Sequence, residues 1–174
     1  MFDSIVCDIL EDYATNPPEN ETDWYAPWTG ILFFLFPVSQ GYFVTPMAYF
    51  PINNHQPPYL AFEVSRWTEP PRSGPLRRPL LIVVLMYSKD WQAGIPSLET
   101  EINRLIDAAF SGETIGGTAI SKVYWIGVIG PHWRFGVKED NGQRATPLID
   151  WHDTTHDEAS FDDFQYLAAL VGKM

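Results

Sequence analysis

Apolar positions repeat with helical spacing at both ends of the chain. In residues 2–13 they recur every three or four positions and most acids lie between them, which is typical of an amphipathic helix. Residues 161–171 repeat the pattern behind Ser160, a residue type that caps helices, with Asp162 and Asp163 in the predicted first turn. Helices are therefore expected at both termini.

A third apolar stripe predicts a helix in the middle of the chain. Leu98, Ile102 and Ile106 stand one helical turn apart, and Leu105 and Ala109 extend the stripe. Residues 94–96, Gly-Ile-Pro, are expected to break the chain, Ser97 to cap the helix, and residues 111–112 to end it.

Other segments read as strands. Residues 80–86 are continuously apolar with a β-branched centre, which predicts a central strand buried on both faces. Residues 31–36 fit either a short buried helix or a strand, because six consecutive apolar residues do not define a period. Pro46 and Pro51 restrict residues 45–50 to an edge strand or a broken one. Further strands are expected at 42–44, 59–67, 122–129, 133–138 and 146–150, with a turn at 53–58 and loops at 68–79 and 112–117.

The order of these elements predicts the fold class. A buried strand, an amphipathic helix and another buried strand form a β-α-β unit, and the remaining strands extend one sheet. We therefore expect an α/β fold with a central mixed β-sheet flanked by helices. The 174 residues suit a single domain, with a helix and acidic linker at 1–25 and the core at 28–171.

Charge is unevenly distributed. The net charge is -11, and residues 1–25 and 150–163 hold seven and six acids respectively, with no Lys or Arg in either segment. Because nucleic acids are bound mainly by clustered cations, this balance argues against a nucleic-acid partner. It leaves a protein partner or self-association as the expectation.

Segments that would direct the chain elsewhere are not apparent. Residues 1–10 contain Asp3 and Asp8 where a signal peptide needs a basic start, and the apolar runs are too short to span a bilayer. The single cysteine, Cys7, cannot form an intramolecular disulfide. An intracellular protein, cytoplasmic or nuclear and without a membrane partner, is expected.

Several short motifs occur in a distinctive order. They are Trp-Thr-Gly at 28–30, Leu-Phe-Pro at 35–37, Gln-Gly-Tyr-Phe-Val-Thr-Pro at 40–46 and Val-Tyr-Trp-Ile-Gly-Val-Ile-Gly-Pro-His-Trp-Arg-Phe at 123–135. With the element order, this arrangement resembles a group of fungal proteins with a restriction-endonuclease-like, PD-(D/E)XK fold. The resemblance covers residues 28–171.

The resemblance implies where a metal site would lie. In such folds an acid on one strand and a Glu/Asp-x-Lys on the next hold one or two Mg²⁺ ions that activate water for phosphodiester cleavage. Here the first acid corresponds to Ala61, and the acid and lysine of the pair correspond to Val84 and Met86. These side chains offer no oxygen ligands, so the chain resembles a catalytically degenerate member, a pseudonuclease, for which no cofactor is expected.

A displaced site is the alternative. Side chains alternate along a strand, so Glu63 shares a face with Ala61, and Asp90 shares one with Val84 if the strand stays regular. Glu63, Lys89, Asp90 and Glu101 are then the candidate catalytic residues of a divergent Mg²⁺-dependent nuclease. Arg66, Arg72, Arg77 and Arg78 are the candidate phosphate-binding residues.

Two further features are candidates for binding. His152 and His156 would share a face of a helix and could ligate a transition metal, although their acidic surroundings are more typical of a loop. Seven Trp, eight Tyr and eleven Phe exceed the needs of one core. A small-molecule-binding protein or unusual enzyme with an aromatic pocket is therefore a third hypothesis. Aromatic residues expected in loops or at strand ends are Trp24, Tyr25, Trp28, Trp67 and Trp91.

Overall fold

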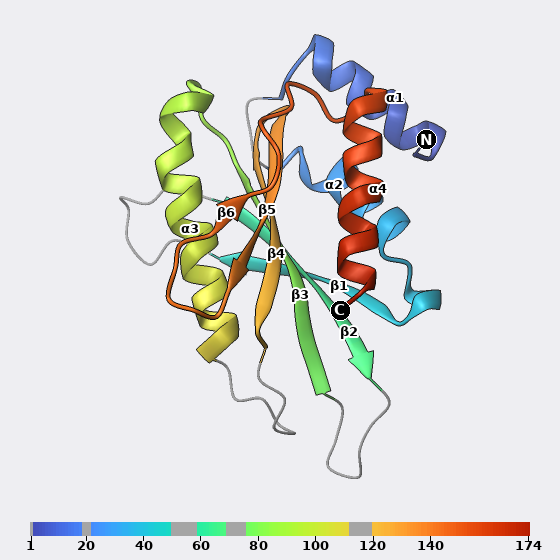
Figure 1. Ribbon diagram of the computed structural model, residues 1–174. Coiled ribbons are helices and arrows are strands. Elements are labelled where there is room, and N and C mark those ends of the chain that lie inside the picture. The colour runs from blue at the N-terminus through green and yellow to red at the C-terminus, as the bar shows by residue number, and fades with distance from the viewer. Residues whose placement is uncertain (1, 19–21, 50–58, 69–75, 112–119) are drawn as a thin grey trace.

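A computed structural model describes residues 2–18, 22–49, 59–68, 76–111 and 120–174. Within these residues the fold is α/β, with a mixed sheet of six strands in the order β1-β2-β3-β4-β5-β6 (Figure 1). The helices are α1 (Ser4–Thr15), α2 (Tyr25–Leu35), the 3-10 helix η1 (Val38–Gln40), α3 (Trp91–Ser111) and α4 (Glu158–Gly172). The strands are β1 (Tyr42–Tyr49), β2 (Tyr59–Thr68), β3 (Leu76–Met86), β4 (Lys122–Ile129), β5 (His132–Glu139) and β6 (Thr146–Pro147).

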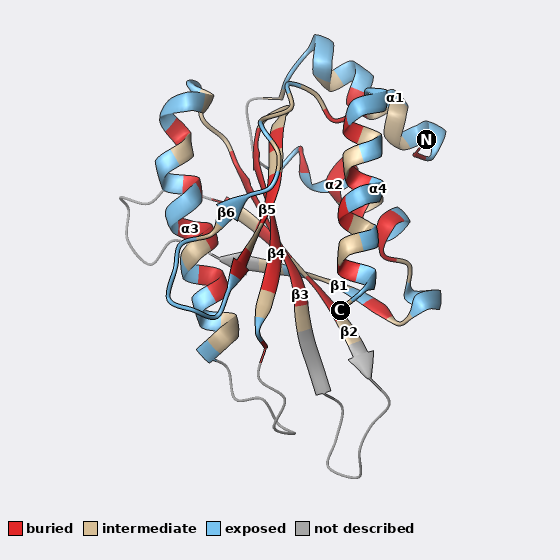
Figure 2. Cartoon of the chain, viewed as in Figure 1, coloured by how far each residue is buried: buried red, intermediate tan, exposed pale blue. Residues whose placement is uncertain are grey.

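Strand β3 lies in the middle of the sheet. It pairs with β2 in antiparallel and with β4 in parallel, and α3 connects β3 to β4. Alternate side chains of β3 enter two separate cores: Val83 faces α1, α2 and α4, whereas Val84 faces α3. Figure 2 shows the resulting band of buried residues between the helical layers. The prediction of a central strand buried on both faces is confirmed.

Helix α3 begins earlier than predicted. The chain turns helical at Trp91, because the Asp90 carboxylate accepts hydrogen bonds from the N–H groups of Gln92 and Ala93. The expected break at residues 94–96 and the expected cap at Ser97 are wrong. Gly94 lies inside the helix and lets it approach β4, since an added Cβ would lie 3.2 Å from Ile129 Cδ1. The expected end at Ser111 is confirmed.

The segment with the ambiguous apolar run is helical. Residues 31–35 belong to α2, which begins at Tyr25. Tyr25 and Trp28, expected in loops or at strand ends, therefore lie in a helix. Trp24 and Trp28 are only 2% and 0% exposed and pack in the core. The predicted loop is wrong for Trp28, which lies in α2, whereas Trp24 stands in the turn just before the helix. Both rings are buried, so the expected exposed binding surface is wrong for both.

Some boundaries differ from the prediction by a few residues. Strand β3 begins at Leu76 and includes Pro79, which pairs with Ser65 beside an irregularity in β2, so the expected loop at 68–79 is too long. Asp157 rather than Ser160 caps α4, with its side chain accepting from the Ser160 N–H. Strand β6 is only two residues long. Strand β1 continues through Pro46 at the edge of the sheet, as expected. The expected turn at 53–58 and the expected loop at 112–117 lie outside the described residues.

Candidate functional site

The three positions that would carry the metal site lie together in the sheet. Ala61 on β2 is directly paired with Val84 on β3, and Met86 follows on the same face. Their exposed fractions are 2%, 0% and 4%. Apolar side chains of α3, among them Leu98 and Ile102, belong to the same packed cluster. The positions that the resemblance assigns to the metal ligands are thus filled by buried apolar side chains.

The displaced candidates do not converge. Glu63 pairs with Ile82, whereas Asp90 follows Met86 at the other end of β3. Because β2 and β3 are antiparallel, Glu63 lies farther than Ala61 from the end of β3 that leads to Asp90. At the usual rise of a strand, its partner Ile82 already stands about 13 Å from Met86. The predicted convergence of Glu63 with Asp90 is wrong for this reason.

Lys89 and Asp90 lie in the connection between β3 and α3. Asp90 is occupied as the cap of α3, with Oδ1 at 3.1 Å from the Gln92 nitrogen and 3.3 Å from the Ala93 nitrogen. Lys89 is exposed beside it. These contacts give the acid at residue 90 a structural role at the start of α3.

Glu101 lies on α3 and forms a small polar cluster with β2. It is buried and pairs with Arg104 one turn later, whose Nη2 also donates to Tyr59 Oη at 2.8 Å. Burial, followed by the hydrogen bond and charge of Glu101, raises the pKa of Tyr59 above its ordinary value. Tyr59 is therefore held as the neutral phenol between the helix and the sheet.

The candidate phosphate-binding arginines are only partly described. The Arg66 guanidinium lies over the ring of Tyr42, 5.4 Å from its centroid. Arg77 and Arg78 stand in β3 opposite Trp67 and Arg66, and their side chains, like the whole of Arg72, lie outside what the structure describes. Their role in phosphate binding stays a prediction.

The two candidate histidines point to different partners. His152 stacks on Trp133 with 4.8 Å between ring centroids, and its Nε2 lies 2.8 Å from Asp163 Oδ2. His156 lies in the loop before α4 with Nδ1 at 2.5 Å from Thr154 Oγ1. The segment is a loop, as its composition predicts. In the described part of the chain no three His, Cys, Asp or Glu side chains are grouped so as to hold a metal ion.

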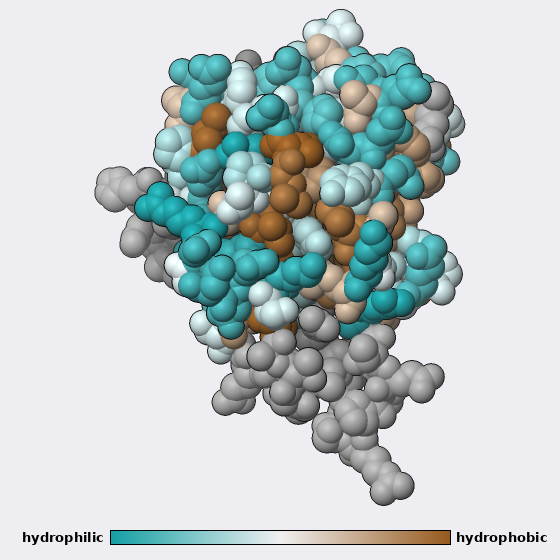
Figure 3. Space-filling view, viewed as in Figure 1, coloured by the Kyte–Doolittle hydropathy of each residue, from teal (hydrophilic) through white to brown (hydrophobic). Residues whose placement is uncertain are grey.

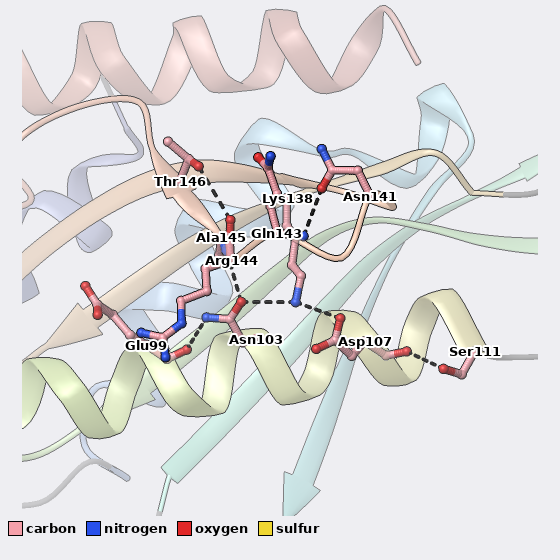
Figure 4. Close-up of polar contacts among 10 residues, drawn as sticks. All are labelled: Glu99, Asn103, Asp107, Ser111, Lys138, Asn141, Gln143, Arg144, Ala145 and Thr146. Carbon is pink, nitrogen blue, oxygen red and sulfur yellow. Dashed lines mark hydrogen bonds and ion pairs between the residues drawn. The ribbon is translucent and has the colours of Figure 1, made fainter.

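A polar seam between α3 and β5 was not predicted from the sequence. Lys138 is only 5% exposed, and its Nζ lies 2.6 Å from Asp107 Oδ1 and 3.0 Å from Asn103 Oδ1 (Figure 4). Asn103 also accepts from the Ala145 N–H, which fixes the chain before β6. The only sequence signal is a row of polar residues along one side of α3, at positions 99, 103 and 107.

A second part of this seam holds a largely buried arginine, whose side chain is 12% exposed. Arg134 pairs with Glu99, and its guanidinium lies over the rings of Trp125 and Trp151 at 5.8 Å and 4.6 Å. Trp151 contacts Trp91, which stacks on His132 at 4.2 Å. The His132 ring lies 3.2 Å from the exposed carboxylate of Asp153. Aromatic faces and one carboxylate thus occupy the surroundings of Arg134, as in a structural cation–π site.

Comparisons with protein-family models, curated proteins and solved structures gave no match to this chain. The helices in the described part of the chain include none with the length and apolar character needed to cross a membrane.

Proposed function

We propose that this chain is a PD-(D/E)XK-like domain without nuclease activity that acts through contacts with other proteins. One observation carries the proposal: the three positions assigned to the metal ligands meet on one sheet face and are filled by Ala61, Val84 and Met86. A hard cation needs oxygen ligands, and these three side chains supply only methyl, methylene and thioether groups.

The arrangement of the strands supports the fold assignment within this proposal. The first acid and the acid-x-Lys pair of the resembling fold stand on consecutive strands, and here Ala61 and Val84 are register partners on β2 and β3. Helix α3 then covers that face. This placement is what the proposal expects of the three positions, and their side chains leave a cation without oxygen ligands.

A cleavage assay tests the proposal. The purified chain is incubated with labelled single-stranded and double-stranded DNA and RNA in Mg²⁺ or Mn²⁺, with EDTA as the control. We expect no metal-dependent cleavage. Cleavage that requires the metal and is lost in Glu63→Ala or Asp90→Ala would overturn the proposal in favour of the displaced nuclease site.

A further inference from the structure

The helices on the face of the sheet opposite α3 differ in composition from the rest of the molecule. Helices α1, α2 and α4 lie together on that face (Figure 1). With their capping residues, α1 and α4 hold eight acids and one cation, Lys173. The acids are Asp3, Asp8, Glu11, Asp12, Asp157, Glu158, Asp162 and Asp163.

Helix α2 lies between these acidic helices and carries no charge. It contacts both neighbours: Phe34 packs against Phe2 beside α1 and against Phe161 of α4, at 5.5 Å and 6.2 Å between ring centroids. Gly30 of α2 approaches Val6 of α1 so closely that an added Cβ would lie 2.7 Å from Val6 Cγ2. An uncharged helix is thus flanked on two sides by acids.

The same layer exposes large apolar side chains. Among the described residues eight large hydrophobic side chains are exposed, and six of them lie on these helices and η1. Phe33 and Phe34 on α2 are each 46% exposed, and Val38 on η1 is 55% exposed. Exposed apolar surface within a charged rim is typical of a protein-docking site. The six are Ile5, Tyr25, Phe33, Phe34, Val38 and Tyr166.

A different apolar area lies on another part of the surface. Figure 3 shows apolar side chains gathered at the centre of the visible face, around β5 and α4. Outside the layer of α1, α2 and α4, Leu148 directly follows β6 and is 45% exposed.

We propose that the α2 surface, defined by Phe33, Phe34 and Val38, docks a cationic amphipathic helix of another protein. The apolar side chains of that helix would cover these three residues, and its Lys and Arg side chains would reach the carboxylates of α1 and α4. Charge complementarity selects this occupant, because a second copy bound through the same surface would bring two acidic layers together. The inference deepens the proposed interaction role and rests on it.

Binding of two matched model peptides tests the inference. Each has about 18 residues, about five helical turns, with the same Leu positions; one carries Lys and the other Glu at the polar positions. Fluorescence anisotropy of the labelled peptides is measured against the whole chain. We expect the Leu/Lys peptide to bind at least about tenfold more tightly than the Leu/Glu peptide, with weaker binding at high salt.

Matched variants locate the surface. Phe33→Ser combined with Val38→Ser is expected to weaken binding of the Leu/Lys peptide by about tenfold, because the apolar contacts are lost. Leu148→Ser, a change at an equally exposed leucine outside the layer, leaves binding unchanged. Asp8→Asn combined with Glu11→Gln keeps the apolar surface and reduces the preference for the Leu/Lys peptide. Thermal unfolding confirms that each variant is folded.

Three outcomes would overturn the inference. They are equal affinity for the two peptides, an equal loss of binding in Leu148→Ser, and a dimer in light scattering that Phe33→Ser dissociates. The last result would assign the surface to a second copy of the chain. Each outcome is measured independently of the cleavage assay. Cleavage together with peptide binding would contradict only the proposed lack of nuclease activity, whereas no cleavage and no peptide binding would contradict only the docking surface.

Discussion

At the scale of single residues, a substitution at Val84 tests whether the three assigned positions lie in an apolar, closed environment. It is fully buried between β2, β4 and the residues of α3. Val84→Glu places an acid where the resemblance implies one. The buried carboxylate would have no cation or hydrogen-bond donor positioned to pair with it. We expect the free energy of unfolding to fall by about 3 kcal/mol or more, measured by urea denaturation.

A matched substitution separates burial from the change of residue type. Val38→Glu introduces the same group at a side chain that is 55% exposed, and its effect should stay within about 0.5 kcal/mol. If Val84→Glu were as stable as the parent chain and bound Mn²⁺ in calorimetry, the layer beneath α3 would be an accessible site, contrary to the geometry described above.

The buried Lys138 allows a second residue-scale prediction. Its partner Asp107 is 60% exposed, so the loss of Asp107 and the loss of Lys138 should lower the free energy of unfolding by different amounts. Asp107→Ala leaves the buried ammonium with Asn103 as its remaining described partner and should cost about 2 kcal/mol, whereas Lys138→Met leaves a solvated carboxylate and should cost less than about 1 kcal/mol. Chemical denaturation of both variants measures the difference.

The double variant completes this thermodynamic cycle. With Lys138→Met in place, the further change Asp107→Ala should have almost no effect, because no buried charge remains to be compensated. An equal cost of Asp107→Ala in both backgrounds would show that Lys138 reaches solvent or another partner.

Tyr59 links stability to alkaline pH. Burial and Glu101 raise its pKa in the folded chain, so the folded state holds the phenol proton more tightly than the unfolded chain, in which the pKa is about 10. This contribution to stability is fully present below pH ~10 and is lost as the pH rises toward the folded-state pKa. Urea denaturation between pH ~8 and ~11 should therefore show a smaller alkaline loss in Tyr59→Phe than in the parent chain.

Tyr166 serves as the control because its side chain is 53% exposed. Tyr166→Phe makes the same chemical change at an exposed side chain, so it controls for the loss of one tyrosine in itself. An unchanged alkaline loss in Tyr59→Phe would mean that other groups cause it.

At the scale of elements, α1 has one favourable and one unfavourable terminus. Asp3 caps the helix by accepting from the Ile5 N–H at 3.0 Å, where the helix dipole favours a negative charge. Glu11 and Asp12 stand near the other end, and the last turn contains no basic residue. Asp12→Lys should therefore raise the free energy of unfolding by about 0.5 kcal/mol.

The same substitution at the opposite end should have the opposite sign. Asp3→Lys removes the cap and places a cation at the positive end of the dipole, and should cost about 1 kcal/mol or more. Thermal unfolding at low ionic strength measures both. If the two variants shifted the melting temperature in the same direction, tertiary contacts of α1 rather than its dipole would govern these positions.

The elements that the sequence predicts well are those with an unambiguous period. The apolar run at 80–86 and the stripe at Leu98, Ile102, Leu105 and Ile106 become β3 and the buried face of α3. The start of α3 was missed because Gly94 and Pro96 are local breakers, whereas the Asp90 cap and the close packing of Gly94 on Ile129 favour helix. The cap is a local signal, which the two breakers outweighed in the prediction. The packing of Gly94 on Ile129 is a tertiary contact that no local pattern contains.

The candidate site shows a similar division. The alternation of side chains correctly places Ala61, Val84 and Met86 on one face. The expected convergence of Glu63 with Asp90 failed because it also requires the relative direction of β2 and β3, which follows from pairing between strands and not from either strand alone. The seam of Lys138, Asn103 and Asp107 depends on α3 crossing β5, again a long-range arrangement.

At the scale of the whole molecule, charge is divided between the two faces of the sheet. The side with α3 and β5 pairs its cations internally, as in Arg134 with Glu99 and Lys138 with Asp107. The opposite side carries the unbalanced acids of α1 and α4. This division places most of the net charge where the proposed partner would bind, and it makes the free chain subject to self-repulsion.

Salt should therefore stabilise the free chain. Raising NaCl from about 0.02 M to about 0.5 M shortens the Debye length from more than 20 Å to less than 5 Å, which screens repulsion among the acids of one layer. We expect the melting temperature to rise with salt. The triple variant Asp8→Asn, Glu11→Gln and Asp12→Asn should melt higher at low salt and respond less to added salt, because α1 then contributes fewer like charges. A melting temperature that falls with salt would show instead that the ion pairs on the α3 side dominate the electrostatic stability of the fold.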